Sequence, residues 1–321
     1  MLYFMLGDYM DWYFIVLIIL VSLLFLVLLI SFICFMMAFF SRNKKNKTNK
    51  IIIPNNDFYN SYREEIIQDI KDVRKYNYTE YSIISFDGLK LYGRYFEKVK
   101  GAPIELMFHG YRGSSERDLS TGVKRAFLCN RNVFLVDQRG SGKSQGHVIS
   151  FGINERKDCV AWVDFLTKKF GMDQKIILTG VSMGAATVLM SSTMNLPNNV
   201  IGVLADCGYS SPSEIIKKVV KEMKLPVKVF YPFIKLGARI FGKFNLEQTS
   251  PYECVQKATL PIIFFHGDKD GFVPYEMSKK LYEACTSEKK LVLIKDADHG
   301  ISYLKDPDLY IKELNDFFKN K

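Results

Sequence analysis

The fold of this chain follows from six residues, Thr179-Gly180-Val181-Ser182-Met183-Gly184. An apolar run over 175–178 precedes them and a run of small and apolar residues over 185–190 follows, which predicts a strand, a sharp turn and a helix. A serine on such a turn is held in strained backbone geometry with its hydroxyl exposed above the sheet. Glycines fit two positions before and after it, because larger side chains would collide with the neighbouring strand and helix. The turn also aims the first N–H groups of the helix at whatever the serine attacks.

This G-x-S-x-G pattern marks Ser182 as a candidate nucleophile, and its partners lie near the end of the sequence. Asp270 follows an apolar strand-like run and His299 follows the next one, so the order is Ser…Asp…His with each residue after a strand. A serine hydroxyl is a weak nucleophile until an imidazole takes its proton, and a carboxylate fixes the tautomer of that imidazole. We therefore predict a catalytic triad of Ser182, Asp270 and His299. The alternative is a glycine-flanked serine in an ordinary loop.

Two other carboxylates compete for the role of the acid. Asp206 follows another expected strand and is the second candidate, and Asp268 is either a turn residue or the acid. Among the four histidines of the chain, His299 is favoured as the base because His147 and His266 have no comparable context.

A glycine-rich turn, residues 109–113, follows the apolar run 104–108 and suits an oxyanion hole. Such a turn can point a backbone N–H toward the ester oxygen. We assign the oxyanion donors as the N–H groups of Tyr111 and Met183, and we expect His109 to brace the loop rather than to act as the base.

A second glycine-rich stretch, residues 137–144, contains the letters G-K-S of a phosphate-binding loop. The first glycine of that motif would fall at position 137, which is Asp137, so the nucleotide-binding interpretation fails. A structural turn is the better explanation, and we expect Asp137 to pair with Arg139.

Elsewhere the apolar pattern predicts an α/β fold. Two alternating runs around Asp87-Gly88 predict a hairpin, and strand-like runs then alternate with helical ones. The expected strands are 81–86, 89–96, 104–108, 132–136, 175–179, 200–205, 261–265 and 290–295, and the expected helices are 116–129, 154–170, 183–194, 275–285 and 308–319. We predict a mostly parallel sheet with an N-terminal hairpin and helices on both faces. An amphipathic helix over 58–76 is expected to pack on this domain.

The N-terminal segment, residues 1–40, has the length and composition of a transmembrane anchor. Its 29 residues from Trp12 to Phe40 carry no charge and would form a helix roughly 43 Å long, against ~30 Å for the hydrocarbon core. A signal peptide is the rival, but its apolar core would be too long and no basic segment precedes it. We therefore expect an uncleaved, single-pass anchor.

The charges beside this anchor predict its orientation. Asp8 and Asp11 flank one end, whereas Arg42 and four nearby lysines flank the other, so the positive-inside rule predicts a cytoplasmic catalytic domain at the cell membrane. Residues 41–56 are polar and basic and predict a linker, which leaves residues 57–321 for the hydrolase domain.

Composition excludes several classes of protein. The chain is 48% hydrophobic and 24% charged, as globular domains are, and its formal net charge is +10. The basic residues are spread out and no nucleic-acid motif is present, so an anionic membrane surface is the expected partner. The six cysteines form no C-x-x-C pair and no zinc pattern, which favours free thiols. The predicted triad chemistry needs no metal or organic cofactor.

At these motifs the chain resembles the α/β-hydrolase superfamily. It is most similar to the bacterial membrane-anchored serine hydrolases related to the serine aminopeptidase-like (S33) and ABHD-type groups. The resemblance covers about residues 80–320 and rests on 109–113, 137–144, 180–184, 205–209, 266–274 and 299–300. It implies hydrolysis through an acyl-enzyme, an acid at Asp270 rather than Asp206, and a helical cap formed by an insert at about 211–250.

This insert combines an apolar stripe with a basic face. It is therefore expected either to line an acyl pocket and contact anionic lipid, or to pack on the sheet as a solvated helix pair.

The predicted function is hydrolysis of carboxylic acyl esters, among them amphiphilic or lipid-like ones, with a small-molecule acyl substrate and the membrane as partners. A serine aminopeptidase-like peptidase is the close alternative, although it needs an acidic group to hold the substrate amine and none is identified. A non-catalytic membrane-anchored binding or scaffold module is the alternative from another class, and an intact triad argues against it.

Overall fold

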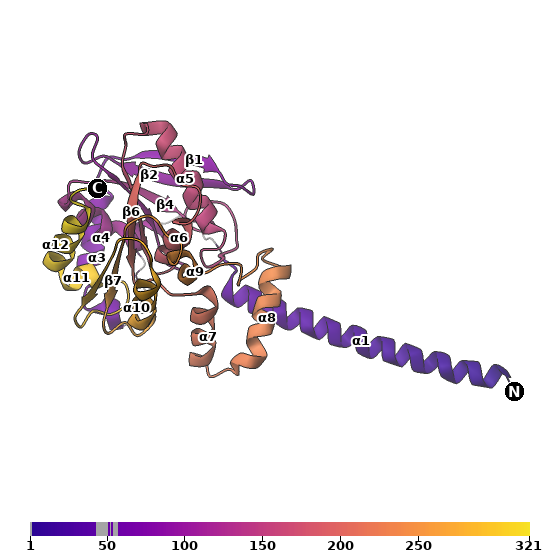
Figure 1. Cartoon of the computed structure of the whole chain (residues 1–321). Helices are drawn as coiled ribbons and strands as arrows, with labels where there is room; N and C mark the ends of the chain where they lie inside the picture. The colour runs from indigo at the N-terminus through magenta and orange to yellow at the C-terminus, as the bar shows by residue number, and fades with distance from the viewer. Residues whose placement is uncertain (1, 43–50, 52, 54–56) are drawn as a thin grey trace. The chain divides into compact units, whose positions relative to one another are not determined.

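The computed structural model describes residues 2–42, 51, 53 and 57–321 (Figure 1). The chain divides into two compact units, one made of Met1–Phe40 with Lys217–Asn245 and the other of Ser41–Ile216 with Leu246–Lys321. Most of the predicted basic linker, 41–56, lies outside the described residues.

The second unit contains an eight-stranded sheet whose order is β1-β2-β4-β3-β5-β6-β7-β8. The first three strands in this order pair antiparallel and the others pair parallel, which confirms the predicted fold class. The strands are β1 (Thr79–Ile84), β2 (Lys90–Phe96), β3 (Ile104–Phe108), β4 (Asn132–Asp137), β5 (Ile176–Val181), β6 (Val200–Asp206), β7 (Ile262–Gly267) and β8 (Lys289–Ile294).

Helices cover both faces of this sheet (Figure 1). One face carries α5 (Glu155–Phe170), α6 (Met183–Ser191), α9 (Pro251–Val255) and α10 (Tyr275–Ala284). The other face carries α2 (Asp57–Asn60), α3 (Arg63–Val73), α4 (Ser115–Leu128), α11 (Ser302–Lys305) and α12 (Pro307–Phe318). Because side chains alternate along a strand, Leu106 of β3 packs toward the first group and Met107 toward the second.

The amphipathic helix expected over 58–76 is shorter in the structure, where α3 begins at Arg63. Its apolar stripe is buried on the domain through Ile66, Ile70 and Val73, as predicted. The segment that precedes the sheet therefore belongs to the hydrophobic core of the second unit.

A charged cluster lies within the second face, where β3 carries Glu105 in an otherwise apolar run. Both Glu105 oxygens accept hydrogen bonds from Arg125, at 3.0 and 2.5 Å, and one also accepts from Arg131 at 3.0 Å. Burial raises the pKa of Glu105, but the two guanidinium groups outweigh it and lower the pKa. The carboxylate is thus ionised, and its partners link β3 to α4 and to the start of β4.

The first unit contains α1 (Leu2–Ala38) and α8 (Val227–Ile240); α7 (Pro212–Glu222) precedes α8 in the insert. Among the described residues, α1 is the one helix long and apolar enough to cross a membrane, with a 27-residue candidate span from Trp12 to Ala38. A Cβ at Gly237 of α8 would lie 2.4 Å from the backbone oxygen of Ser31, so glycine is what allows α8 to approach α1 closely. Aromatic rings of the two segments meet beside this contact, with Phe39 and Phe244 centroids 5.2 Å apart.

The turn between β5 and α6 has the strained geometry that the sequence predicts. Ser182 has φ 57° and ψ −116°, a region that side-chain-bearing residues rarely occupy. A Cβ at Gly180 would lie 2.2 Å from the backbone of Gly184, and a Cβ at Gly184 would lie 2.0 Å from the carbonyl oxygen of Phe108. Both neighbours are backbone atoms and cannot swing away, so both positions require glycine.

Replacing Gly184 by alanine should therefore unfold or strongly destabilise the chain, by more than the ~1–3 kcal/mol that overpacking typically costs. The matched control is Gly122→Ala in α4, where a Cβ would meet only Met107 Sδ at an ordinary 3.6 Å and should stabilise the helix by ~0.5–1 kcal/mol. Denaturant unfolding of the two variants in detergent measures the difference. Equal midpoints would show that the close approach at Gly184 is not a constraint.

Candidate active site

Ser182, His299 and Asp270 lie in one hydrogen-bonded line at the carboxyl edge of the sheet. Ser182 Oγ is 3.0 Å from His299 Nε2, and His299 Nδ1 is 2.7 Å from Asp270 Oδ2. Each side chain follows a parallel strand: Ser182 after β5, Asp270 after β7 and His299 after β8. The structure thus brings together three residues that are up to 117 positions apart, in the arrangement that activates a serine hydroxyl.

Asp270 is held as an anion by donors on both oxygens. The N–H groups of Phe272 and Val273 donate to Oδ1 at 2.9 and 2.7 Å, and both imidazoles approach Oδ2. Burial raises the pKa of Asp270, but hydrogen bonds from His266 and then His299 outweigh it and hold the pKa well below its usual range. The carboxylate can therefore orient the His299 ring and stabilise it when charged.

His266 also contacts the acid of this site, a contact that the sequence analysis does not predict. Its Nε2 is 3.0 Å from Asp270 Oδ2 and 2.8 Å from the Val273 carbonyl oxygen. Both are acceptors, so Nε2 carries a proton, while Nδ1 lies 2.7 Å from Ser278 Oγ. A histidine four positions before the acid, at the end of the same strand, was the available signal.

The other candidate acids do not reach the His299 ring. Asp206 is buried and accepts hydrogen bonds from Ser302 Oγ and Tyr310 Oη, each at 3.0 Å. Burial raises the pKa of Asp206 more than these two hydroxyls lower it. Asp268 accepts from the N–H of Asp296 at 2.6 Å and has the turn role that was its alternative.

The loop after β3 is braced by His109, as predicted. His109 Nδ1 is 2.8 Å from the Gly110 carbonyl oxygen, and Nε2 accepts from the N–H of Gln138 at 3.2 Å. Burial lowers the pKa of this histidine, which suits a neutral ring that donates through one nitrogen and accepts through the other. Tyr111 of this loop lines the cavity beside Ser182, and Met183 is the first residue of α6. Their role as oxyanion donors remains a prediction.

The predicted pair between Asp137 and Arg139 is wrong. Arg139 instead binds the buried Asp158 through two contacts of 2.7 Å and Asp87 at 2.9 Å. Asp137 accepts from the Ser115 hydroxyl and from the N–H of Lys143. Adjacent side chains in the turn point to different neighbours, which sequence proximity does not reveal.

One group of side chains has the spacing of a metal site, since Cys207, Asp270 and His299 each offer a ligand atom within 4.8 Å of the others. Burial, followed by the charges of Asp206 and Asp270, raises the pKa of the Cys207 thiol well above its usual value. A thiol that resists deprotonation is a poor metal ligand. The atoms with which Asp270 and His299 could bind a metal already take part in hydrogen bonds. The arrangement is suited to proton transfer rather than to metal binding.

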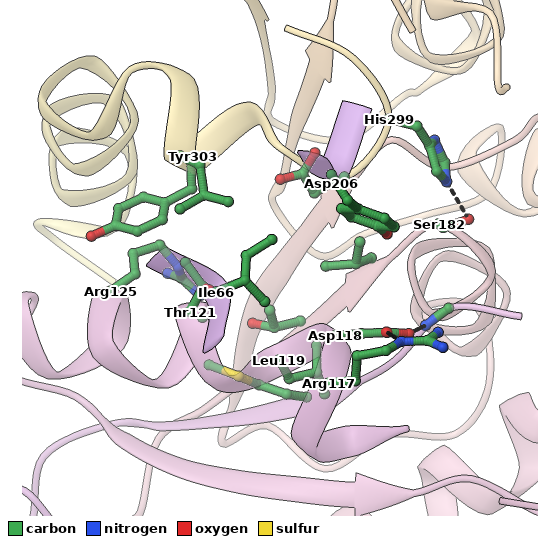
Figure 2. A pocket seen from close by; sticks show the side chains of 18 of the residues that line it. Ile66, Arg117, Asp118, Leu119, Thr121, Arg125, Ser182, Asp206, His299 and Tyr303 are labelled. Carbon is green, nitrogen blue, oxygen red and sulfur yellow. Dashed lines mark hydrogen bonds and ion pairs between the residues drawn. The ribbon is translucent and has the colours of Figure 1, made fainter. Parts of the chain in front are cut away.

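A cavity of about 420 Å³ reaches Ser182 and His299 at one end (Figure 2). Figure 2 shows that it continues past Asp206 and Ile66 to Arg125 and Tyr303. It lies on the side of the sheet covered by α3 and α4. The candidate nucleophile therefore stands at the mouth of an internal space.

Comparison with known proteins agrees with this architecture. The model of the prolyl oligopeptidase family matches residues 130–321. Protein YqkD of Bacillus subtilis is 27% identical over 190 residues, which cover 59% of this chain and 62% of that protein. Protein bem46 of Schizosaccharomyces pombe is 26% identical over 198 residues, or 60% of each chain. The chain thus spans about three fifths of the length of these relatives.

A solved structure shows the same fold over most of the chain. The Pyrococcus furiosus esterase Pf2001 has a TM-score of 0.63 and 20% identity, and the match covers 84% of this chain and 96% of the esterase. These comparisons confirm the predicted α/β-hydrolase superfamily.

The two carboxylates at this site are expected to respond differently to the same change. Asp270→Asn should lower kcat by on the order of 10⁴-fold, because an amide favours the wrong tautomer of His299. Asp206→Asn leaves one of its two hydroxyl donors without an acceptor, so it should cost ~1–3 kcal/mol of stability and change kcat less than tenfold. Ester turnover and unfolding of both variants provide the measurement; a larger kcat loss at Asp206 would reverse the assignment of the acid.

Proposed function

Because the chain belongs to the prolyl oligopeptidase family of α/β hydrolases, we propose that it is a serine hydrolase that cleaves carboxylic esters through an acyl-enzyme. The observation that carries this proposal is the line of hydrogen bonds from Ser182 through His299 to Asp270. Its geometry is that of a nucleophile, a general base and an orienting acid.

In the proposed reaction, Ser182 Oγ attacks the ester carbonyl while His299 Nε2 takes the hydroxyl proton. The carbonyl oxygen becomes an oxyanion that accepts hydrogen bonds from the N–H groups of Tyr111 and Met183. Collapse of this intermediate breaks the bond to the alcohol, which leaves with the proton from His299. Water then attacks the acyl-enzyme with His299 again as base, which releases the acid and restores Ser182.

Peptidase activity is the second candidate, and the family match favours it. An aminopeptidase needs a free carboxylate to hold the substrate's amine, and two acidic groups line the cavity. Asp118 is bound by Arg117 at 2.6 Å and by the N–H of Gly110 at 3.2 Å, and Asp206 is bound by two hydroxyls. Because both are engaged, ester hydrolysis is the better-supported reaction.

We also propose that α1 anchors the enzyme in a membrane with the hydrolase unit on the cytoplasmic side. The charge difference across α1 supports this orientation, with Arg42 and four lysines following it. Helix α8 packs on α1 and carries Lys228, Lys235 and Arg239 together with exposed Val229 and Ile240. Such a helix suits contact with anionic lipid.

Ser182→Ala should abolish ester turnover and labelling by a fluorophosphonate probe while the fold remains intact. The side chain is small and 7% exposed, so its removal changes little packing. Rates with p-nitrophenyl acetate and an aminoacyl p-nitroanilide would separate the esterase from the peptidase. A folded wild-type chain that neither turns over nor binds the probe would favour the scaffold alternative.

Reporter proteins fused after Lys321 would test the proposed orientation of α1 in the membrane. A fluorescent protein fused there should fluoresce, and alkaline phosphatase should be inactive, because the carboxyl terminus is expected in the cytoplasm. Replacing Arg42 and the four lysines by glutamate should weaken this preference. Active phosphatase on the unmodified chain would contradict the proposed topology.

A further inference from the structure

The cavity that begins at Ser182 lies in an unusual position between the sheet and helices α3 and α4. Its floor is made by side chains of three parallel strands, Met107 of β3, Thr179 of β5 and Leu204 of β6. Its other walls come from Ile66 of α3 and Leu119 of α4. We propose that this cavity holds the acyl chain of the substrate, a proposal that rests on the esterase function above.

The lining is suited to hydrocarbon because its apolar side chains come from every wall. Met107, Leu119 and Leu204 belong to the buried core and present one side to the space. Ile53 and Ile66 add further apolar surface. Transfer of an alkyl chain from water onto such surface is favourable in proportion to the area buried.

Several polar groups of the lining are already engaged within the protein. Arg125 is bound by Glu105, Thr179 donates to Glu105 at 3.1 Å, and Asp206 accepts from Ser302 and Tyr310. No lining residue contributes a buried side-chain nitrogen or oxygen that lacks a partner. These groups therefore require no polar group from a ligand.

The shape of the cavity favours one chain that extends inward from the nucleophile. Ser182 and His299 stand at one end, and Arg125 and Tyr303 at the other (Figure 2). A dry cavity of about 150 Å³ accepts a six-carbon ring, so in proportion about 420 Å³ has room for roughly fifteen carbons. This capacity fits a single acyl chain.

The acyl side of the ester, rather than the alcohol side, is assigned to this space. The acyl group stays bonded to Ser182 while the alcohol must depart toward solvent after taking a proton from His299. A departing group that lay deep in the cavity, toward Arg125 and Tyr303, would have to pass the acyl-enzyme to leave by the mouth at Ser182 (Figure 2). The alkyl chain held inside the cavity is therefore the acyl chain, which remains bonded to Ser182.

Part of the wall comes from the segment that precedes the sheet. Ile53, Tyr59 and Ile66 all lie before β1 and pack in the same core cluster as β6 and α12. The Tyr59 hydroxyl also lies near Gly300, where an added Cβ would be 3.8 Å from it. This segment thus contributes to the proposed acyl site as well as to packing.

The test uses the full-length chain in detergent and p-nitrophenyl esters of two to twelve carbons, kept below their micelle concentrations. With the wild type, kcat/KM should rise about fourfold for each added methylene until the cavity is filled. Gly122 of α4 lines the cavity, and a Cβ there would meet only Met107 Sδ. Gly122→Leu adds a four-carbon side chain at this position, so it should fold and should shorten the best substrate by about four carbons. Its kcat/KM should fall most for the longest esters and least for the acetate ester.

Leu128→Trp is the matched control, because it adds bulk to the same helix at a side chain that is 65% exposed. It should leave the chain-length profile unchanged. Alkyl acetates of increasing alcohol length should show no comparable rise.

A flat acyl profile in the wild type, an equal loss on all esters in Gly122→Leu, or a length dependence that follows the alcohol would overturn the assignment. Failure of the esterase proposal gives a different result, since no ester, acetate included, would then be hydrolysed and Ser182 would not be labelled.

Discussion

The site depends on a backbone crossing that permits no side chain. At Gly184 the first turn of α6 passes so close to the Phe108 carbonyl that an added carbon would lie 2.0 Å from its oxygen. This contact fixes α6 against β3, and with it the angle at which Ser182 leaves β5. The positive φ of Ser182 is the local cost of that angle, and it raises the hydroxyl above the strand ends toward His299.

The charge states of two acidic residues are set at the same edge of the sheet. The loop after β7 surrounds Asp270 with two backbone N–H groups and the His266 ring, so the acid stays charged although it is buried. That leaves His299 with a fixed partner on Nδ1 and its Nε2 directed at Ser182. By contrast, Asp206 at the end of β6 is surrounded by hydroxyls, and burial raises its pKa. The pKa values of two carboxylates at the ends of adjacent strands are thus shifted in opposite directions, because their hydrogen-bond donors differ.

Much of this could be predicted from sequence because the decisive features are local. The β5 turn, the strand–helix alternation and the order of Ser182, Asp270 and His299 depend on spacing along the chain. Features that depend on which distant groups meet were harder: Arg139 pairs with Asp158 and Asp87 rather than with Asp137. The contact of His266 with Asp270 was not predicted either, since it forms only when the loop after β7 folds back. The cavity could not be foreseen, since strands, helices and loops that lie far apart in the sequence enclose it together.

The close approach of Gly237 to the backbone of Ser31 has a consequence for α1. Residues about two hundred positions apart form one packed unit, in which Phe35 and Phe39 are covered by Phe241 and Phe244. Helix α1 is therefore not interchangeable with another apolar helix. Another helix of equal length and hydrophobicity would not present the closely fitting surface that α8 requires. A chain that lacks α1 would expose Phe241 and Phe244 as an apolar, aggregation-prone surface.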